Sequence, residues 1–317
     1  MSATINEIIS NISYFKTNDN ANIAYTVVGD INNNNNNIVL CFNPAGHNIY
    51  GWSHCASILN NAGITCILHD CRGSGYSDAA TNKSSSKEEY NKQFHFDTYC
   101  NDAANLLKYL NVTEKVIVWG SSWGARVATV FASTHGKYAK ALCAYDISIG
   151  AAAPPIQQAG NKMAYLAAQS NNINLPQGHE KMTFHKNKPQ RTLGATRKKP
   201  YDKANTFADC VLPNLNCPVL IAIGEFDPNM VTKPGGGKQF YEMLVQESQV
   251  ESIEYTIIKE CGHGSVLTRP ILAAAEFVSY CMRNNLIRYD KNSTFMLQQD
   301  LLSKLTTGKY VYMAEKY

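Results

Sequence analysis

Short apolar runs rich in β-branched residues alternate along this chain with longer segments of helical periodicity. This alternation is typical of crossover units, in which parallel strands are connected by helices that cover a sheet. Most runs are apolar throughout, as strands buried on both faces should be. We therefore predict an α/β fold. The predicted strands cover residues 21–29, 38–42, 64–69, 116–119, 141–147, 219–224 and 253–259.

Helical periodicity appears between these runs, and the last predicted helix opens with Pro270, a residue that helices tolerate in their first turn. The rhythm of strands and helices stops between residues 149 and 216. In this interval basic residues outnumber acidic ones, and the remainder of the chain is close to neutral. The predicted helices cover residues 52–60, 97–110, 122–133, 238–245 and 270–283.

Composition excludes several classes of protein. With 44% hydrophobic and 17% charged residues, the chain is typical of a globular protein. Its formal charge of +4 is too small to indicate a nucleic-acid partner. Every apolar stretch is far shorter than the roughly 20 residues of a membrane-spanning helix. The first ten residues lack the basic start and apolar run of a signal peptide, so we expect a cytoplasmic protein.

The ten cysteines are spread along the chain, and several lie within apolar strand-like runs. No C-x-x-C pair occurs, so zinc-ribbon and thioredoxin-like chemistry have no support. Free cysteine behaves as a small hydrophobic residue. We predict reduced, mostly buried thiols, and neither a metal nor a cofactor.

The motif Gly120-Ser121-Ser122-Trp123-Gly124 follows a predicted strand and precedes a predicted helix. This G-x-S-x-G pattern, in this context, is typical of a nucleophile elbow. The turn brings backbone segments so close together that a Cβ atom at either glycine would clash. We predict that Ser122 is a nucleophile.

A serine hydroxyl needs a base to remove its proton and an acid to orient that base. His263 follows the strand predicted at 253–259, and the glycines on both sides let the loop place its ring over the end of the strand. Asp227 follows the strand at 219–224 and is our candidate acid. Glu225, in the same segment, and Asp146, at the end of the predicted strand at 141–147, are the alternatives.

With these residues in order, the chain resembles the α/β-hydrolase superfamily from about residue 12 to residue 283. The motif Asp70-Cys71-Arg72-Gly73-Ser74-Gly75-Tyr76-Ser77-Asp78 is similar to the family's D-x-R-G-x-G-x-S loop, to which we assign a structural role. The resemblance implies an eight-stranded, mostly parallel sheet with helices on both faces and a cap after the sixth strand. The implied organisation is core at 1–148, cap at 149–216, core at 217–284 and a C-terminal extension at 285–317.

An oxyanion hole requires two backbone N–H groups, and one comes from the residue after the nucleophile, here Trp123. Aligned on Trp52, the family's second donor loop corresponds to Asn43-Pro44-Ala45, which makes the Ala45 amide the second donor. The amide of Gly46 is the alternative. We interpret His47 as a surface histidine.

These residues predict a serine hydrolase that cleaves a small-molecule carboxylic ester, thioester or lactone through an acyl-enzyme. Two alternatives remain. The elbow is similar to the G-G-S-W-G elbow of prolyl iminopeptidases, which suggests an aminopeptidase. A ligand receptor that retains the fold without rapid turnover is the other. Epoxide hydrolases and haloalkane dehalogenases of this fold carry an aspartate at the elbow, so Ser122 argues against both.

Overall fold

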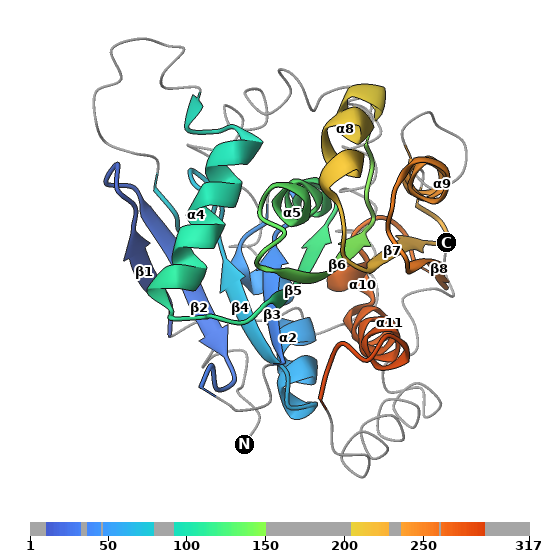
Figure 1. Cartoon of the computed structure of the whole chain (residues 1–317). Coiled ribbons are helices and arrows are strands. Elements are labelled where there is room, and N and C mark those ends of the chain that lie inside the picture. Colours follow the sequence, from blue (N-terminus) through green and yellow to red (C-terminus); the bar gives the residue numbers. More distant parts are fainter. Residues whose placement is uncertain are drawn as a thin grey trace.

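An eight-stranded sheet organises the chain, in the order β1-β2-β4-β3-β5-β6-β7-β8 (Figure 1). The computed structural model describes residues 11–32, 37–45, 47–78, 92–149, 204–227, 236–259 and 261–288. Strands β3 to β8 pair in parallel, whereas β1 and β2 run antiparallel at one edge. The strands are β1 (Ser13–Lys16), β2 (Asn22–Val28), β3 (Ile38–Phe42), β4 (Thr65–His69), β5 (Val116–Ser121), β6 (Ala139–Tyr145), β7 (Val219–Gly224) and β8 (Ile253–Ile258).

This arrangement confirms the predicted α/β class and the mostly parallel sheet. The seven predicted strands are all present, with ends that differ by a few residues. Strand β1 was not predicted, because only Phe15 of its four residues is buried and its apolar signal is weak. The central strands β3, β5 and β7 are buried along their whole length, which explains their uninterrupted apolar sequences.

Helices cover both faces of the sheet (Figure 1). One face packs against α4, α5, α8 and α9, and the other against α2, α10 and α11. On the second face the Trp119 ring stacks on Phe277 at 4.4 Å and meets Trp52 edge-on at 4.9 Å. The helices are η1 (Ile49–Trp52), α2 (Ser53–Asn61), α4 (Phe96–Tyr109), α5 (Trp123–Thr134), α8 (Ala204–Val211), η3 (Leu212–Asn214), α9 (Gly237–Glu247), α10 (Ser265–Thr268) and α11 (Pro270–Arg283).

The part of the predicted cap that precedes residue 204 lies outside the described residues, as does the C-terminal extension beyond residue 288. Residues 204–216, the end of the predicted cap, lie against the core. Phe207 of α8 is fully buried and meets Phe240 of α9 edge-on at 5.9 Å. The division of the chain into core and cap therefore stays a prediction.

All ten cysteines lie in the described segments, where they are free thiols, and nine of them are buried. This agrees with the prediction of buried, reduced thiols. No helix within the described ranges combines the length and the hydropathy needed to cross a membrane.

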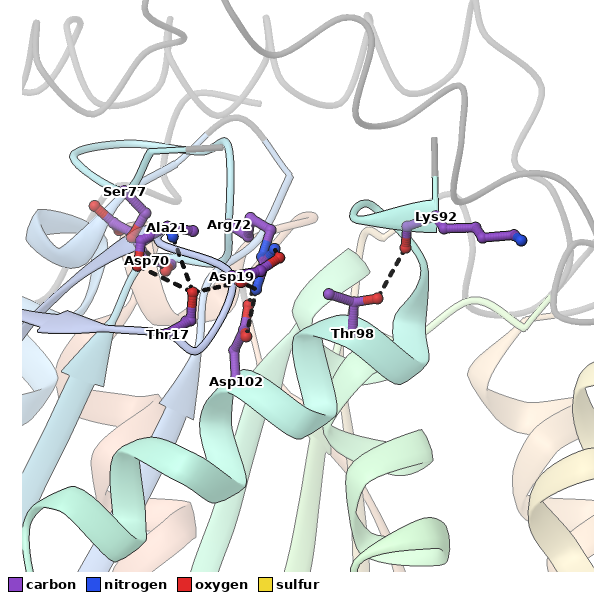
Figure 2. Close-up of polar contacts among 9 residues, drawn as sticks. All are labelled: Thr17, Asp19, Ala21, Asp70, Arg72, Ser77, Lys92, Thr98 and Asp102. Carbon is purple, nitrogen blue, oxygen red and sulfur yellow. Dashed lines mark hydrogen bonds and ion pairs between the residues drawn. The ribbon is translucent and has the colours of Figure 1, made fainter. Parts of the chain in front are cut away.

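Arg72, from the D-x-R-G motif, forms a buried ion pair beneath the loop after β4 (Figure 2). Its Nε and Nη2 atoms each donate to Asp102 of α4 at 2.8 Å, and Nη2 also donates to Asp19 at 2.9 Å. The side chains of Arg72 and Asp102 are 3% and 8% exposed, whereas Asp19 is 49% exposed. Burial raises the pKa of Asp102, although Arg72 acts in the opposite direction. Arg72 therefore ties α4 to the loop that follows β4.

We expect the substitution Arg72→Met to lower the free energy of unfolding by about 3–5 kcal/mol, because it leaves the Asp102 carboxylate buried without its partner. Asp19→Asn is the matched control. It removes the exposed half of the same network and should cost about 1 kcal/mol or less. Urea denaturation measures both. Equal losses in the two variants would contradict the assignment of the buried pair as the stabilising one.

Candidate functional site

Ser122 lies at the sharp turn between β5 and α5. Its backbone angles are φ 56° and ψ −119°, a conformation that residues with a side chain rarely adopt. Two hydrogen bonds hold this turn: the Ser122 amide donates to the Tyr145 carbonyl at 2.8 Å, and the Ser122 carbonyl accepts from the Ala125 amide at 3.0 Å. Strained backbone of this kind persists only where its surroundings maintain it, and it is frequent at functional sites.

The two glycines of the motif make this turn possible. A Cβ atom at Gly120 would lie 2.3 Å from the Gly124 carbonyl oxygen, inside the turn itself. One at Gly124 would lie 2.2 Å from the carbonyl oxygen of Phe42 and 2.4 Å from that of Asn43. The first turn of α5 therefore lies directly against the end of β3, where the predicted oxyanion loop begins.

The structure brings the predicted nucleophile, base and acid into one hydrogen-bonded line. The His263 Nε2 atom lies 2.7 Å from Ser122 Oγ, and Nδ1 lies 2.8 Å from Asp227 Oδ2. The Asp227 side chain is completely buried, and that of His263 is 11% exposed. Ser122 and Asp227 follow strands of the same parallel sheet, so their side chains meet at its carboxyl edge.

Electrostatics at this site favour the charged imidazole. Burial lowers the pKa of His263, but the charges of Asp227 and Asp146 and the hydrogen bond to Asp227 outweigh it and raise the pKa to about 9. The raised pKa makes the neutral imidazole a stronger base for the neighbouring hydroxyl, and that neutral form gains population as the pH rises towards 9.

The acid and histidine segments approach each other through Gly224. A Cβ atom at this position would lie 2.3 Å from the Gly262 carbonyl oxygen. Two backbone hydrogen bonds bind the segments together, from the Phe226 amide to the Cys261 carbonyl at 2.7 Å and from the Glu225 amide to the Ile258 carbonyl at 2.9 Å. Close backbone packing thus places Asp227 beside His263.

The two alternative acids have other partners. The Glu225 carboxylate pairs with the exposed Lys259 side chain, with 2.9 Å between the nitrogen and oxygen atoms. Asp146 is buried after β6, and its carboxylate accepts from Ser265, two residues after His263. Asp227 is the acid that lies at hydrogen-bond distance from the imidazole, with 2.8 Å between its Oδ2 atom and His263 Nδ1.

Ala45 lies in a tight turn after β3, where the His47 amide donates to the Pro44 carbonyl at 3.1 Å. Gly46, the alternative donor, lies outside the described residues. Trp123 is the first residue of α5, a position whose amide has no acceptor within its own helix. Both predicted oxyanion donors thus come from backbone segments that adjoin Ser122.

Asp70 holds this loop at both ends, which agrees with the structural role assigned to its motif and shows what that role is. Its Oδ1 atom accepts from the Asn43 side chain at 2.7 Å and from the Ile49 amide at 2.8 Å. Its Oδ2 atom accepts from the Tyr76 amide at 2.7 Å, and a Cβ atom at Gly75 would collide with that oxygen. Burial raises the pKa of Asp70 to about 7, against these three hydrogen bonds.

Figure 2 shows Asp70 beside Ser77, whose hydroxyl donates to the Asp70 carbonyl at 2.7 Å. The D-x-R-G-x-G-x-S motif therefore has a physical explanation in this chain. Its aspartate holds the loop after β3, its arginine pairs with α4, and its serine closes the turn. In the sequence, the motif indicates that Asp70 has a structural role, but it does not indicate that Asn43 is the partner of Asp70.

The interpretation of His47 as a surface histidine was wrong. Its side chain is half-buried, and its Nδ1 atom is buried with no hydrogen-bond partner in the described part of the chain. Burial and the nearby His263 lower its pKa to about 4. His47 is therefore neutral and adjoins the site. The tight turn at Pro44 folds it inward, which the polar sequence around it did not indicate.

No cluster of three or more histidine, cysteine or acidic side chains within the described ranges is arranged to hold a metal ion.

Residues 37–171 match the family described as alpha/beta hydrolase fold. The AB hydrolase superfamily protein YfhM of Bacillus subtilis (strain 168) is 35% identical over 98 residues, which are 31% of this chain and 31% of that protein. The match thus spans about a third of that curated relative's length.

Two solved structures extend the comparison to most of the chain. The thioesterase domain from the curacin biosynthetic pathway has a TM-score of 0.61 at 14% identity, covering 86% of this chain and 99% of that domain. The malate-bound esterase from Thermogutta terrifontis has a TM-score of 0.58 at 19% identity, covering 86% and 97%. At these identities the likeness concerns the fold alone.

We expect Gly124→Ala to destabilise the protein by about 1–3 kcal/mol, because the new methyl group must displace the backbone at the end of β3. Gly262→Ala is the matched control, since no atom lies within 4 Å of a Cβ atom at that position. It should change stability by about 0.5 kcal/mol at most. Urea denaturation of the two variants measures the difference, and equal stabilities would contradict the tight contact at Gly124.

Proposed function

Because residues 37–171 match the family described as alpha/beta hydrolase fold, we propose that this chain is a serine hydrolase that cleaves a carboxylic ester, thioester or lactone through an acyl-enzyme. One observation carries the proposal. Ser122, His263 and Asp227 form a continuous hydrogen-bonded line, with distances of 2.7 Å and 2.8 Å, at a strained strand-to-helix turn.

In the acylation step the Ser122 oxygen attacks the substrate carbonyl carbon while His263 Nε2 takes the hydroxyl proton. In the neutral imidazole, which is the form that acts as the base, the Asp227 carboxylate accepts from Nδ1–H and so leaves Nε2 without a hydrogen. After the proton transfer the same carboxylate stabilises the imidazolium. The carbonyl oxygen becomes an oxyanion. The amides of Trp123 and Ala45 donate hydrogen bonds to it, and the loop that carries Ala45 is held by Asp70.

When the tetrahedral intermediate collapses, the bond to the leaving group breaks and the His263 imidazolium returns its proton to the departing alcohol or thiol. Water then enters, and neutral His263 removes a proton from it as it attacks the acyl carbon. The second collapse releases the carboxylic acid and restores the Ser122 hydroxyl. Both half-reactions use the same base, so a single histidine suffices.

The substrate class is supported by the comparisons and by the carboxylates near the site. The structural neighbours include a thioesterase domain and an esterase. An aminopeptidase needs a carboxylate to hold the free α-amine of its substrate. The two carboxylates that act on His263, Asp227 and Asp146, are engaged by His263 and Ser265. In the part of the chain that the structure describes, these two carboxylates are thus already occupied within the site, which supports ester-like substrates over aminoacyl amides.

A fluorophosphonate probe should label the protein at Ser122, and Ser122→Ala should abolish both labelling and turnover, because the Ser122 hydroxyl lies 2.7 Å from His263 Nε2. Peptide mapping of the labelled protein identifies the modified residue. Ser121→Ala is the control, since the Ser121 hydroxyl faces Asp146 and not the imidazole. Labelling at Ser121 would contradict the proposal.

The substrate class can be tested by measuring turnover of a panel of compounds. The panel contains acyl esters of graded chain length, thioesters, lactones and aminoacyl amides. Turnover of esters with no cleavage of the amides supports the proposal. Preferential cleavage of aminoacyl amides would show an aminopeptidase instead. Tight binding of a substrate analogue without turnover would show a receptor.

His263→Ala should lower kcat by several orders of magnitude, and Asp227→Asn should lower it by about 10⁴-fold, because an amide at this position favours the wrong imidazole tautomer. Glu225→Gln is the matched control, since this carboxylate pairs with Lys259. Its kcat should stay close to that of the unmodified enzyme. A large loss in Glu225→Gln with a small loss in Asp227→Asn would reverse the assignment of the acid.

A further inference from the structure

Asp146 is a second acidic residue at the edge of the sheet, immediately after β6, and the catalytic steps above do not use it. Its side chain is fully buried, and its φ of 54° is in the left-handed region. The Asp146 amide donates to the Ala222 carbonyl of β7 at 2.8 Å, which fixes the backbone in this conformation. A buried carboxylate and a strained backbone conformation both cost free energy of folding, so favourable contacts must offset that cost. The contacts of Asp146 therefore show which parts of the structure it holds together.

The Asp146 carboxylate connects the nucleophile turn with the histidine loop. Its Oδ2 atom accepts from the Ser265 amide at 2.8 Å and from the Ser265 hydroxyl at 2.7 Å. The Ser121 hydroxyl, directly before the nucleophile, donates to the same oxygen at 3.4 Å. Ser265 is the first residue of α10, and its amide is one that α10 cannot satisfy by itself.

The histidine loop needs such an anchor because of Gly264. This glycine separates His263 from Ser265 and has a φ of 88°. Among the described residues, the atom nearest to a Cβ atom at this position would be Leu267 Cδ1, at 3.7 Å. Close packing at Gly224 acts on the Gly262 side of His263, and the bonds to Asp146 act on the Ser265 side. The bonds to Asp146 fix Ser265, and through it the backbone that carries His263.

Resting on the serine-hydrolase function proposed above, we infer that Asp146 is a positioning residue. It holds the His263 loop against the nucleophile turn through Ser265 and places a second negative charge near the imidazolium that forms in catalysis.

The charges around His263 agree with this inference. Asp146 and Asp227 both raise the pKa of His263, and the neighbouring His47 is neutral. Burial raises the pKa of Asp146 to about 6, while His263 and Ser265 act to lower it. Cys261 and Arg269, which flank the loop, are further titratable groups among the described residues. Because Asp146 ionises below the range in which His263 titrates, its charge is present when the imidazole gains its proton.

The experiment compares three variants. In Asp146→Asn the amide oxygen still accepts from the Ser265 amide, but the charge is lost. We expect the pH limb of kcat/KM that reports His263 to move to lower pH, and kcat to fall about tenfold for each unit of that shift. Asp146→Ala also loses the anchor, so kcat should fall by about 10²-fold. Ser265→Ala keeps the charge and the backbone bond, so its pH limb should stay in place with a smaller loss of kcat.

Glu225→Gln is the charge control, because it removes a carboxylate of the same edge of the sheet that pairs with Lys259. Its pH limb should match that of the unmodified protein. An NMR titration of the His263 imidazole in the unmodified protein and in Asp146→Asn gives the same comparison without substrate. It also provides a readout if Asp146→Ala does not fold, which circular dichroism will show.

A His263 titration that is identical in Asp146→Asn and the unmodified protein would overturn the inference. This failure differs from failure of the proposed function. If the unmodified protein turns over esters and Ser122→Ala does not, the function holds even when Asp146→Asn behaves normally. If fluorophosphonate labels no residue, the proposed function fails, and the NMR titration still decides whether Asp146 acts on His263.

Discussion

The left-handed backbone at Ser122 is the constraint on which the rest of the site depends. A non-glycine residue at φ 56° is unfavourable, and two hydrogen bonds with two flanking glycines maintain it. The same turn raises Ser122 Oγ above the sheet, ends β5 and begins α5. It also requires that α5 contact the end of β3 through Gly124, so one local structure sets the positions of the proposed nucleophile and of the loop proposed to hold the oxyanion.

Around this turn, the parallel register of the sheet gathers the polar groups at one edge. Strands β5, β6 and β7 are neighbours, and each delivers a functional side chain just beyond its last residue: Ser122, Asp146 and Asp227. The histidine arrives from the loop after β8, guided by close packing at Gly224. The order of the strands therefore brings these three side chains close together, although they are far apart in the sequence.

Buried carboxylates form the supporting framework. Asp70, Asp102, Asp146 and Asp227 are each buried, and each has donors or a cation as partners. Asp102 and Asp70 stabilise the loops after β4 and β3, whereas Asp146 and Asp227 act near the histidine. Each pairing offsets the free-energy cost of removing a carboxylate from water. The same contacts also fix the position of one loop.

The sequence alone determined the fold class, seven of the strands, and the contexts of Ser122, His263 and Asp227, because apolar periodicity and strand-end motifs are local properties. It missed β1, a short edge strand with one buried residue. Only the tertiary structure decided that Asp227 rather than Glu225 faces His263. The same holds for the contact of Asp70 with the loop that carries Ala45 and for the inward position of His47. It also holds for the hydrogen bonds by which Asp146 joins the turn at Ser122 to Ser265. These choices depend on side chains from segments far apart in the chain, whose distances follow from sheet order and backbone packing and leave no periodic signal in the sequence.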